Sequence, residues 1–176
     1  MNLPNKLSTL RILMVPVIIL LLFLNNFMGD LSALILFIIA ALTDKYDGYY
    51  ARRYDMITAL GKILDPLADK LLIYGVLIAF VQLGKITAWP VIIIIARGLA
   101  VTGLRVVAAD QGSVIAASIW GKVKTTIQII TVIALIADPL IINLPIALIT
   151  TLVWTAVLIT IISGYKYFAG AEVDYS

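Results

Sequence analysis

Four aspartates, Asp44, Asp47, Asp65 and Asp69, lie within 26 residues of one another and beside strongly apolar sequence. In a medium of low dielectric constant, their carboxylates would repel one another and be driven toward the neutral form. A divalent cation, or a pair of cations, would remove this repulsion. The chain has no cysteine and no histidine, so oxygen atoms must supply the ligands, which favours Mg²⁺, Mn²⁺ or Ca²⁺.

The spacing of these aspartates places them on two helical stripes. In a helix over residues 31–52, an arc of about 140° carries two carboxylates, two very small residues and a guanidinium: Asp44, Asp47, Gly48, Ala51 and Arg52. In the next helix, positions i, i+4 and i+8 form a stripe about 80° wide: Gly61, Asp65 and Asp69. Helices joined by a short connection are expected to be neighbours. Two Mg²⁺ ions roughly 3.5–4 Å apart between them would clamp phosphoryl oxygens.

Three of these residues, Gly48, Gly61 and Asp65, also have a structural alternative, whereas Asp44, Asp47 and Asp69 have none as simple. Gly48 and Gly61 make room either for a ligand or for close helix packing, which is common in membranes. Asp65 precedes Pro66, the arrangement of a helix N-cap followed by proline. Arg52 has the planar fork that suits phosphate. The other acidic residues are expected to be solvated: Asp30, Asp55, Asp110, Asp138, Glu172 and Asp174.

The composition indicates how these stripes are positioned. The chain is 62% hydrophobic and only 13% charged, with a mean hydropathy of +1.09, which is typical of an integral membrane protein. Its 176 residues predict one all-α domain, residues 1–176, with six transmembrane helices. The predicted spans are 7–24, 31–52, 62–83, 86–108, 113–137 and 143–168. An amphipathic start, with Leu3, Leu7, Leu10 and Met14 at helical spacing, predicts an interfacial N-terminal segment.

The basic residues predict the orientation in the membrane. Of 13 Lys and Arg residues, all but Lys85 lie toward one side of a six-span arrangement, so both termini and the aspartates are expected on the cytoplasmic side. They form no continuous basic stripe, which argues against a nucleic-acid partner. Arg97 and Arg105 lie inside apolar sequence, where a charge costs roughly 2.5–3.5 kcal/mol. They either snorkel to the interface or bind a ligand.

The motif Asp44-x-x-Asp47-Gly48-x-x-Ala51-Arg52, followed after eight residues by Gly61-x-x-x-Asp65-x-x-x-Asp69, resembles the signature of the CDP-alcohol phosphotransferases at every defining position. The resemblance extends over nearly the whole chain. The segments NLPNKLSTLR, GKILDPLADKLL, AVTGLRVVAADQG, GKVKTTIQ and SGYKYF are similar to those of one branch, the bacterial phosphatidylglycerophosphate synthases.

The resemblance implies a six-helix membrane enzyme of the bacterial cytoplasmic membrane. It implies that two divalent cations, Mg²⁺ or Mn²⁺, bind to Asp44, Asp47, Asp65 and Asp69. Gly48, Ala51, Arg52 and Gly61 would shape the CDP site. Asp69 would also be the general base that takes a proton from the acceptor hydroxyl. The substrates implied are CDP-diacylglycerol and sn-glycerol 3-phosphate, whose phosphate would be bound by Arg97, Arg105, Lys122 and Lys124.

Two positions depart from the expected pattern. The chain has Arg97-Gly98 where the synthase branch is expected to have Arg-Glu, and Lys45-Tyr46 where a more apolar pair is expected. The first departure leaves a sister enzyme open, one that uses inositol phosphate, serine or phosphatidylglycerol as acceptor. A cation transporter is a more remote alternative, because intramembrane carboxylates also mark ion paths. Small residues on the helix faces also permit a homodimer.

Overall fold

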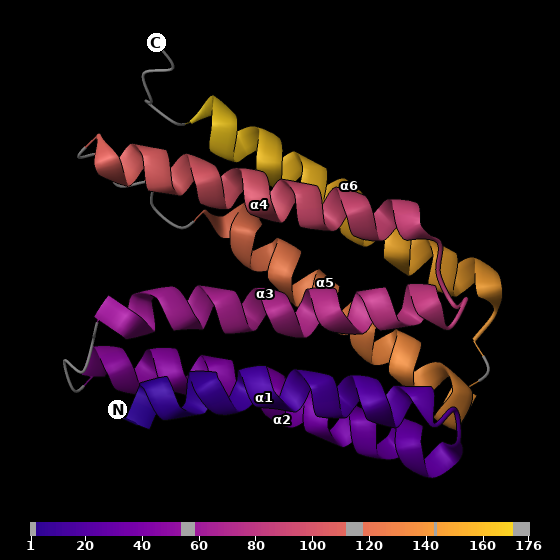
Figure 1. The fold of residues 1–176 in the computed structure, drawn as a ribbon. Helices are drawn as coiled ribbons and strands as arrows, with labels where there is room; N and C mark the ends of the chain where they lie inside the picture. Colours follow the sequence, from indigo (N-terminus) through magenta and orange to yellow (C-terminus); the bar gives the residue numbers. More distant parts are fainter. Residues whose placement is uncertain (1–2, 54–58, 112–117, 143, 171–176) are drawn as a thin grey trace. The chain divides into compact units, whose positions relative to one another are not determined.

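The computed structural model describes residues 3–53, 59–111, 118–142 and 144–170. Within these ranges the chain forms six α-helices and one π-helical turn, with no strand. Figure 1 shows them in chain order: α1 (Leu3–Phe23), α2 (Phe27–Arg53), α3 (Ala59–Gln82), α4 (Ala88–Asp110), α5 (Ile119–Ala137), η1 (Asp138–Ile142) and α6 (Ile146–Ala169). The predicted all-α class and the six predicted helical segments are therefore confirmed in the described part of the chain.

The helices form two compact units, unit 1 (Met1–Ile86 with Val132–Leu144) and unit 2 (Thr87–Thr131 with Pro145–Ser176). In unit 1, α1 packs against both α2 and α3. Fully buried apolar side chains fill this core, among them Ile18, Phe37 and Phe80. A Cβ atom at Gly75 of α3 would lie only 2.8 Å from Val15 of α1. The glycine therefore lets the two helices approach closely, as small residues do between membrane helices.

Unit 2 is built on the packing of α4 against α6. Val91 and Ile94 of α4 and Val157 of α6 are buried in this unit. The first part of α5 is tied to α6 by a buried hydrogen bond, in which Gln128 Nε2 donates to Thr160 Oγ1 over 3.0 Å. Buried polar groups of a membrane protein need such partners, because lipid offers none.

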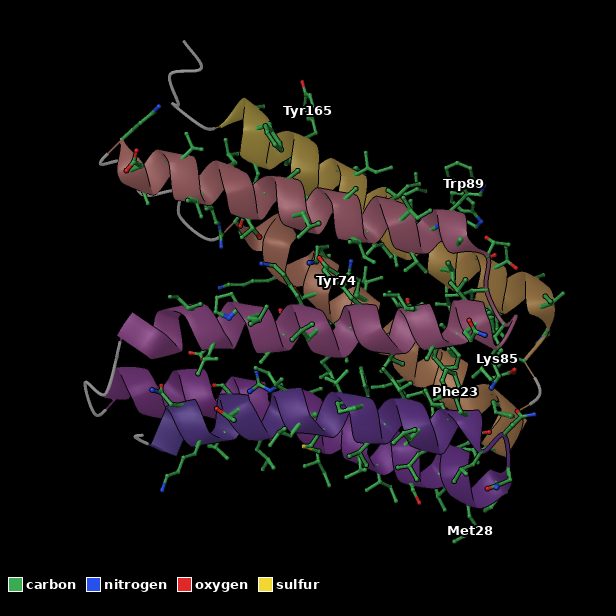
Figure 2. The ribbon with its side chains drawn as sticks, viewed as in Figure 1. Phe23, Met28, Tyr74, Lys85, Trp89 and Tyr165 are labelled. Atoms are coloured by element: carbon green, nitrogen blue, oxygen red, sulfur yellow. The ribbon has the colours of Figure 1, made fainter. Side chains whose placement is uncertain are left out.

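Four described helices are long and apolar enough to cross a membrane, so the chain is a multi-pass membrane protein. They cover Asn5–Phe23, Ala88–Asp110, Ile119–Leu140 and Ile146–Ala169. In α2 the apolar part is shorter, Phe27–Thr43, and α3 carries Asp65, Asp69 and Lys70 in its first half. Six crossings therefore stay a prediction. Large apolar side chains project outward in Figure 2, including Met28 and, at 69% exposed, Trp89. Such surfaces suit lipid rather than water.

The interfacial position of the segment at the start of the chain stays a prediction. From Leu3 onward this segment forms the first turns of α1, and its polar residues Asn5, Ser8 and Arg11 are buried. On the same segment, Leu10 is exposed. The polar side chains of this segment are thus turned toward the inside of unit 1, and Leu10 is turned toward its surface.

Candidate active site

The second aspartate stripe lies on α3 as predicted. Gly61, Asp65 and Asp69 all fall within the helix Ala59–Gln82, so their spacing of four residues places them on one face. Gly61 is buried, and both aspartates are partly buried. The helix begins at Ala59 and contains Pro66 in its interior. Asp65 is therefore not an N-cap, and the structural alternative for this residue is wrong.

The first aspartate stripe lies on the last turns of α2, which ends at Arg53. The backbone there is helical, as predicted, and α2 packs against α3 within unit 1. The side chains of these residues are outside the described part of the structure: Asp44, Asp47, Gly48, Ala51 and Arg52. Convergence of the four carboxylates thus stays a prediction.

Helix α1 contributes a polar stripe that sequence reasoning missed. Asn5, Ser8 and Arg11 follow one another at intervals of three residues, and all three are buried, with Ser8 at 0% and Arg11 at 1% exposed. Ser8 Oγ donates a hydrogen bond to Asp65 Oδ1 over 2.5 Å. A carboxylate that accepts such a bond is fixed in orientation. The signal was present in the sequence as three polar residues on one face of an apolar helix.

The two arginines of α4 are bound by side chains of α6. Arg97 Nη2 donates to Ser163 Oγ over 2.6 Å, and Arg105 Nη2 donates to Tyr167 Oη over 2.8 Å. Ser163 and Tyr167 are one turn apart on α6, and both are buried. The arginines therefore have specific partners within unit 2, which snorkelling to the interface does not by itself require.

Two further cations of unit 2 lie on the first turns of α5. Lys122 is exposed and Lys124 is partly buried. Near them, Lys166 of α6 places its Nζ 4.1 Å from the centre of the Trp120 ring, a cation–π contact. Lys166 therefore links α6 to α5 through the Trp120 ring, whereas the predicted phosphate role of Lys122 and Lys124 stays a prediction.

Sequence comparison decides the family. A family model described as CDP-alcohol phosphatidyltransferase matches residues 1–162. The chain belongs to this family. It is similar to the CDP-diacylglycerol–glycerol-3-phosphate 3-phosphatidyltransferase of Bacillus subtilis, with 46% identity over 96% of this chain and 94% of the relative.

Other bacterial relatives bear the same name. That of Rickettsia felis is 40% identical, over 97% of this chain and 96% of its own length. That of Mycoplasma pneumoniae is 37% identical, over 74% of this chain and 66% of its own length. The predicted resemblance to the CDP-alcohol phosphotransferases is thus confirmed, and the chain is an enzyme of that transferase family.

Within this family enzyme, Asp30 differs from its predicted environment. We expected it to be solvated, but it is buried in the first turn of α2. A carboxylate at this position faces the positive end of the helix dipole, which lowers the cost of its burial. Ser163 and Tyr167 were also missed, because their partners on α4 are more than 60 residues away in sequence.

Proposed function

We propose that the chain transfers the phosphatidyl group of CDP-diacylglycerol to sn-glycerol 3-phosphate, giving phosphatidylglycerophosphate and CMP. The observation that carries this proposal is the near full-length identity of 46% to a Bacillus subtilis protein named for that reaction. The complete eight-residue signature and the arginine pair of unit 2 support it. Both features fit a reaction between a diphosphate-linked lipid and an anionic acceptor.

The proposed metal ligands are Asp44, Asp47, Asp65 and Asp69, which would hold two Mg²⁺ or Mn²⁺ ions. The described members of this set fit a hard cation, because Asp65 and Asp69 present carboxylates on one face of α3 and carboxylate oxygens are the ligands that Mg²⁺ prefers. The hydrogen bond from Ser8 holds one of these carboxylates in place. When bound, the ions would neutralise charge on the pyrophosphate as CMP leaves.

Asp69 is the proposed general base. It would accept the proton of the acceptor hydroxyl as that oxygen forms a bond to the β-phosphorus and the bond from the β-phosphorus to CMP breaks. The chain has no histidine or cysteine, so a carboxylate is the side chain best suited to this transfer at neutral pH. Gly48, Ala51, Arg52 and Gly61 would shape the CDP site, with Arg52 directed to phosphate.

The acceptor phosphate is proposed to bind Arg97, Arg105, Lys122 and Lys124. A phosphomonoester carries close to two negative charges at neutral pH, and guanidinium groups bind such anions through paired hydrogen bonds. The two arginines belong to unit 2, where α6 holds both. Serine as acceptor would not need this concentration of positive charge.

The proposed setting is the bacterial cytoplasmic membrane. Residues 1–176 would form one catalytic domain that crosses the bilayer six times, with both termini and the active site on the cytoplasmic side. The distribution of Lys and Arg supports this orientation. The apolar helix surfaces would contact lipid or a second copy in a homodimer.

Product formation by the purified protein tests the proposal. The enzyme would receive CDP-diacylglycerol and Mg²⁺, with sn-glycerol 3-phosphate, inositol phosphate and serine offered separately. We expect phosphatidylglycerophosphate and CMP from glycerol phosphate alone, and no product after chelation of the metal. Turnover with another acceptor instead would assign the chain to a sister branch of the family. Absence of turnover with all three would contradict the proposal.

A further inference from the structure

Two arginines of α4 share one aromatic ring of α6. The guanidinium carbon of Arg97 lies 5.4 Å from the centre of the Tyr167 ring, and that of Arg105 lies 5.0 Å from the same centre. The arginines are eight residues apart in sequence, or about two helical turns. The ring therefore bridges the space between two cations that would otherwise repel each other, and its π electrons attract both.

The position of Tyr167 is fixed by its own contacts. Its side chain is only 6% exposed. Its hydroxyl oxygen accepts one hydrogen bond from Arg105, over 2.8 Å, and another from the backbone N–H of Ser118, over 3.1 Å. A phenol oxygen offers two acceptor positions. Tyr167 therefore connects α4, α6 and the residue that precedes α5.

Two glycines make room for this arrangement. A Cβ atom at Gly164 would lie 3.0 Å from Cγ of Arg97, and one at Gly121 would lie 3.0 Å from Oη of Tyr167. Both distances are shorter than ordinary van der Waals contact between carbon and its neighbours. The arginine stem and the tyrosine hydroxyl therefore occupy space that an alanine at either position would restrict.

The partners from α6 are neutral hydroxyls. Arg97 donates to Ser163, and Arg105 donates to Tyr167. A carboxylate in these places would orient a guanidinium and cancel much of its charge, whereas a hydroxyl orients it and adds no negative charge of its own. A guanidinium has five N–H donors, and the bond between Arg105 and Tyr167 uses one of them. Such a pair of oriented cations suits a ligand with two negative charges.

We propose that Tyr167, assisted by Ser163, is a positioning residue that holds Arg97 and Arg105 as a preformed receptor for the phosphate of the acceptor. In this arrangement α6 supplies the groups that orient the arginines, in a chain that has Gly98 where a glutamate was expected beside Arg97. The inference rests on the proposed function for its substrate. The receptor itself rests on the contacts within unit 2.

The experiment compares wild type with Tyr167→Phe, Tyr167→Leu and Ser163→Ala. Loss of a hydrogen bond to a charged group is expected to raise the KM for glycerol phosphate roughly tenfold in Tyr167→Phe. Loss of the ring as well is expected to raise it a further several-fold in Tyr167→Leu. Ser163→Ala should raise it roughly five- to tenfold. The KM for CDP-diacylglycerol should be unchanged in all three.

Tyr165→Phe is the matched control. Tyr165 lies two residues earlier on the same helix, projects away from it in Figure 2 and is 74% exposed. The same loss of a hydroxyl there should leave both KM values unchanged. Equal increases in the KM of lipid and acceptor in Tyr167→Phe, or an effect of the same size in Tyr165→Phe, would overturn the proposal.

A second measurement separates this inference from the proposed function. Inorganic phosphate should raise the Tm of wild type by ligand stabilisation, and the increase should be lost in Tyr167→Phe and kept in Tyr165→Phe. If glycerol phosphate is not a substrate but this pattern holds, the proposed function fails and the phosphate receptor stands. If phosphate raises the Tm of wild type and Tyr167→Phe equally, or raises the Tm of neither protein, the proposed phosphate receptor is refuted. This conclusion does not depend on which acceptor the enzyme uses.

Discussion

The aspartate stripe of unit 1 and the arginine pair of unit 2, Arg97 and Arg105, are assembled in different ways. The aspartates repeat at helical spacing within one helix, as Asp65 and Asp69 do on α3. The arginines depend on residues brought from distant parts of the chain, because Tyr167 is 62 residues from Arg105. Helical spacing is visible in a sequence, whereas a partner on another helix is not. The two regions thus differ in how much of their chemistry can be predicted without a structure.

The two regions also differ in how charge is held in place. In unit 1, the hydroxyl of Ser8 donates to a carboxylate of α3. In unit 2, hydroxyls of α6 accept from guanidiniums of α4. In both, a neutral hydroxyl orients a charged group without cancelling its charge. The oriented carboxylate of unit 1 suits a cation, and the oriented guanidiniums of unit 2 suit an anion.

Asp69→Asn should have the largest effect, because it removes the proposed base from unit 1. We expect kcat to fall by about 10²- to 10⁴-fold, measured as CMP release at saturating concentrations of both substrates. The acceptor KM should change little, because the phosphate receptor belongs to unit 2.

Asp110→Asn is the control for this change, since Asp110 is an exposed carboxylate at the end of α4. It should retain wild-type kcat. A kcat for Asp69→Asn within about tenfold of wild type would show that another group takes the proton. Asp69 of unit 1 would then not be the general base.

Ser8→Ala tests whether the polar stripe of α1 belongs to the site in unit 1. The variant loses the hydrogen bond to Asp65, which is worth about 1.5–3 kcal/mol when one partner is charged. We expect kcat to fall by roughly tenfold and the Mg²⁺ concentration for half-maximal activity to rise by a similar factor. Titration of activity with Mg²⁺ measures both.

Thr9→Ala provides the comparison on the same helix. The Thr9 hydroxyl bonds to the backbone carbonyl of Asn5 within α1, so its loss should leave the Mg²⁺ requirement unchanged. If Ser8→Ala and Thr9→Ala behave alike, the serine serves packing only, and unit 1 has no oriented carboxylate to compare with the oriented arginines.

Much of the fold could be predicted from the sequence, because long apolar runs separated by Gly, Pro and Asp mark the ends of helices. The break around Gly84 was located correctly, whereas residues 138–142, predicted as a connection between helices, form the π-helical turn η1. The start of the chain is harder to interpret, for a physical reason. An amphipathic pattern gives the same sequence signal whether its polar face meets water or the interior of a helix bundle, and burial of Ser8 and Arg11 decides for the interior.

The candidate site was predictable only in part, for a related reason. A signature of carboxylates at intervals of three and four residues indicates both the elements and their faces. Arg97 and Arg105 were recognised because charge in apolar sequence is costly. Their partners Ser163 and Tyr167 lie in SGYKYF, a segment that carries the family resemblance. A neutral serine or tyrosine in a membrane helix nevertheless does not indicate which side chain it will contact.

Gly75→Ala should lower the stability of unit 1. The added Cβ would lie 2.8 Å from Val15, and overpacking of this kind costs about 1–3 kcal/mol. We expect a lower Tm in detergent. Gly103→Ala is the matched change in unit 2, where a Cβ would have open space and alanine favours the helix by about 1 kcal/mol. Its Tm should be equal to or above that of wild type. A lower Tm for both would mean that glycine serves backbone flexibility in each helix.

Lys166→Gln should have the smallest effect, and it separates structural from ligand-binding cations within unit 2. The variant loses the contact with the Trp120 ring, which is worth roughly 0.5–1 kcal/mol at a partly exposed site. The Tm should therefore fall slightly, while the KM for glycerol phosphate stays at the wild-type value.

Trp120→Leu should reproduce the small loss in Tm. The double variant should lower the Tm little further, because each change removes the same contact. A raised acceptor KM in Lys166→Gln would instead place this lysine among the phosphate ligands. The receptor would then extend beyond the two arginines that Tyr167 holds.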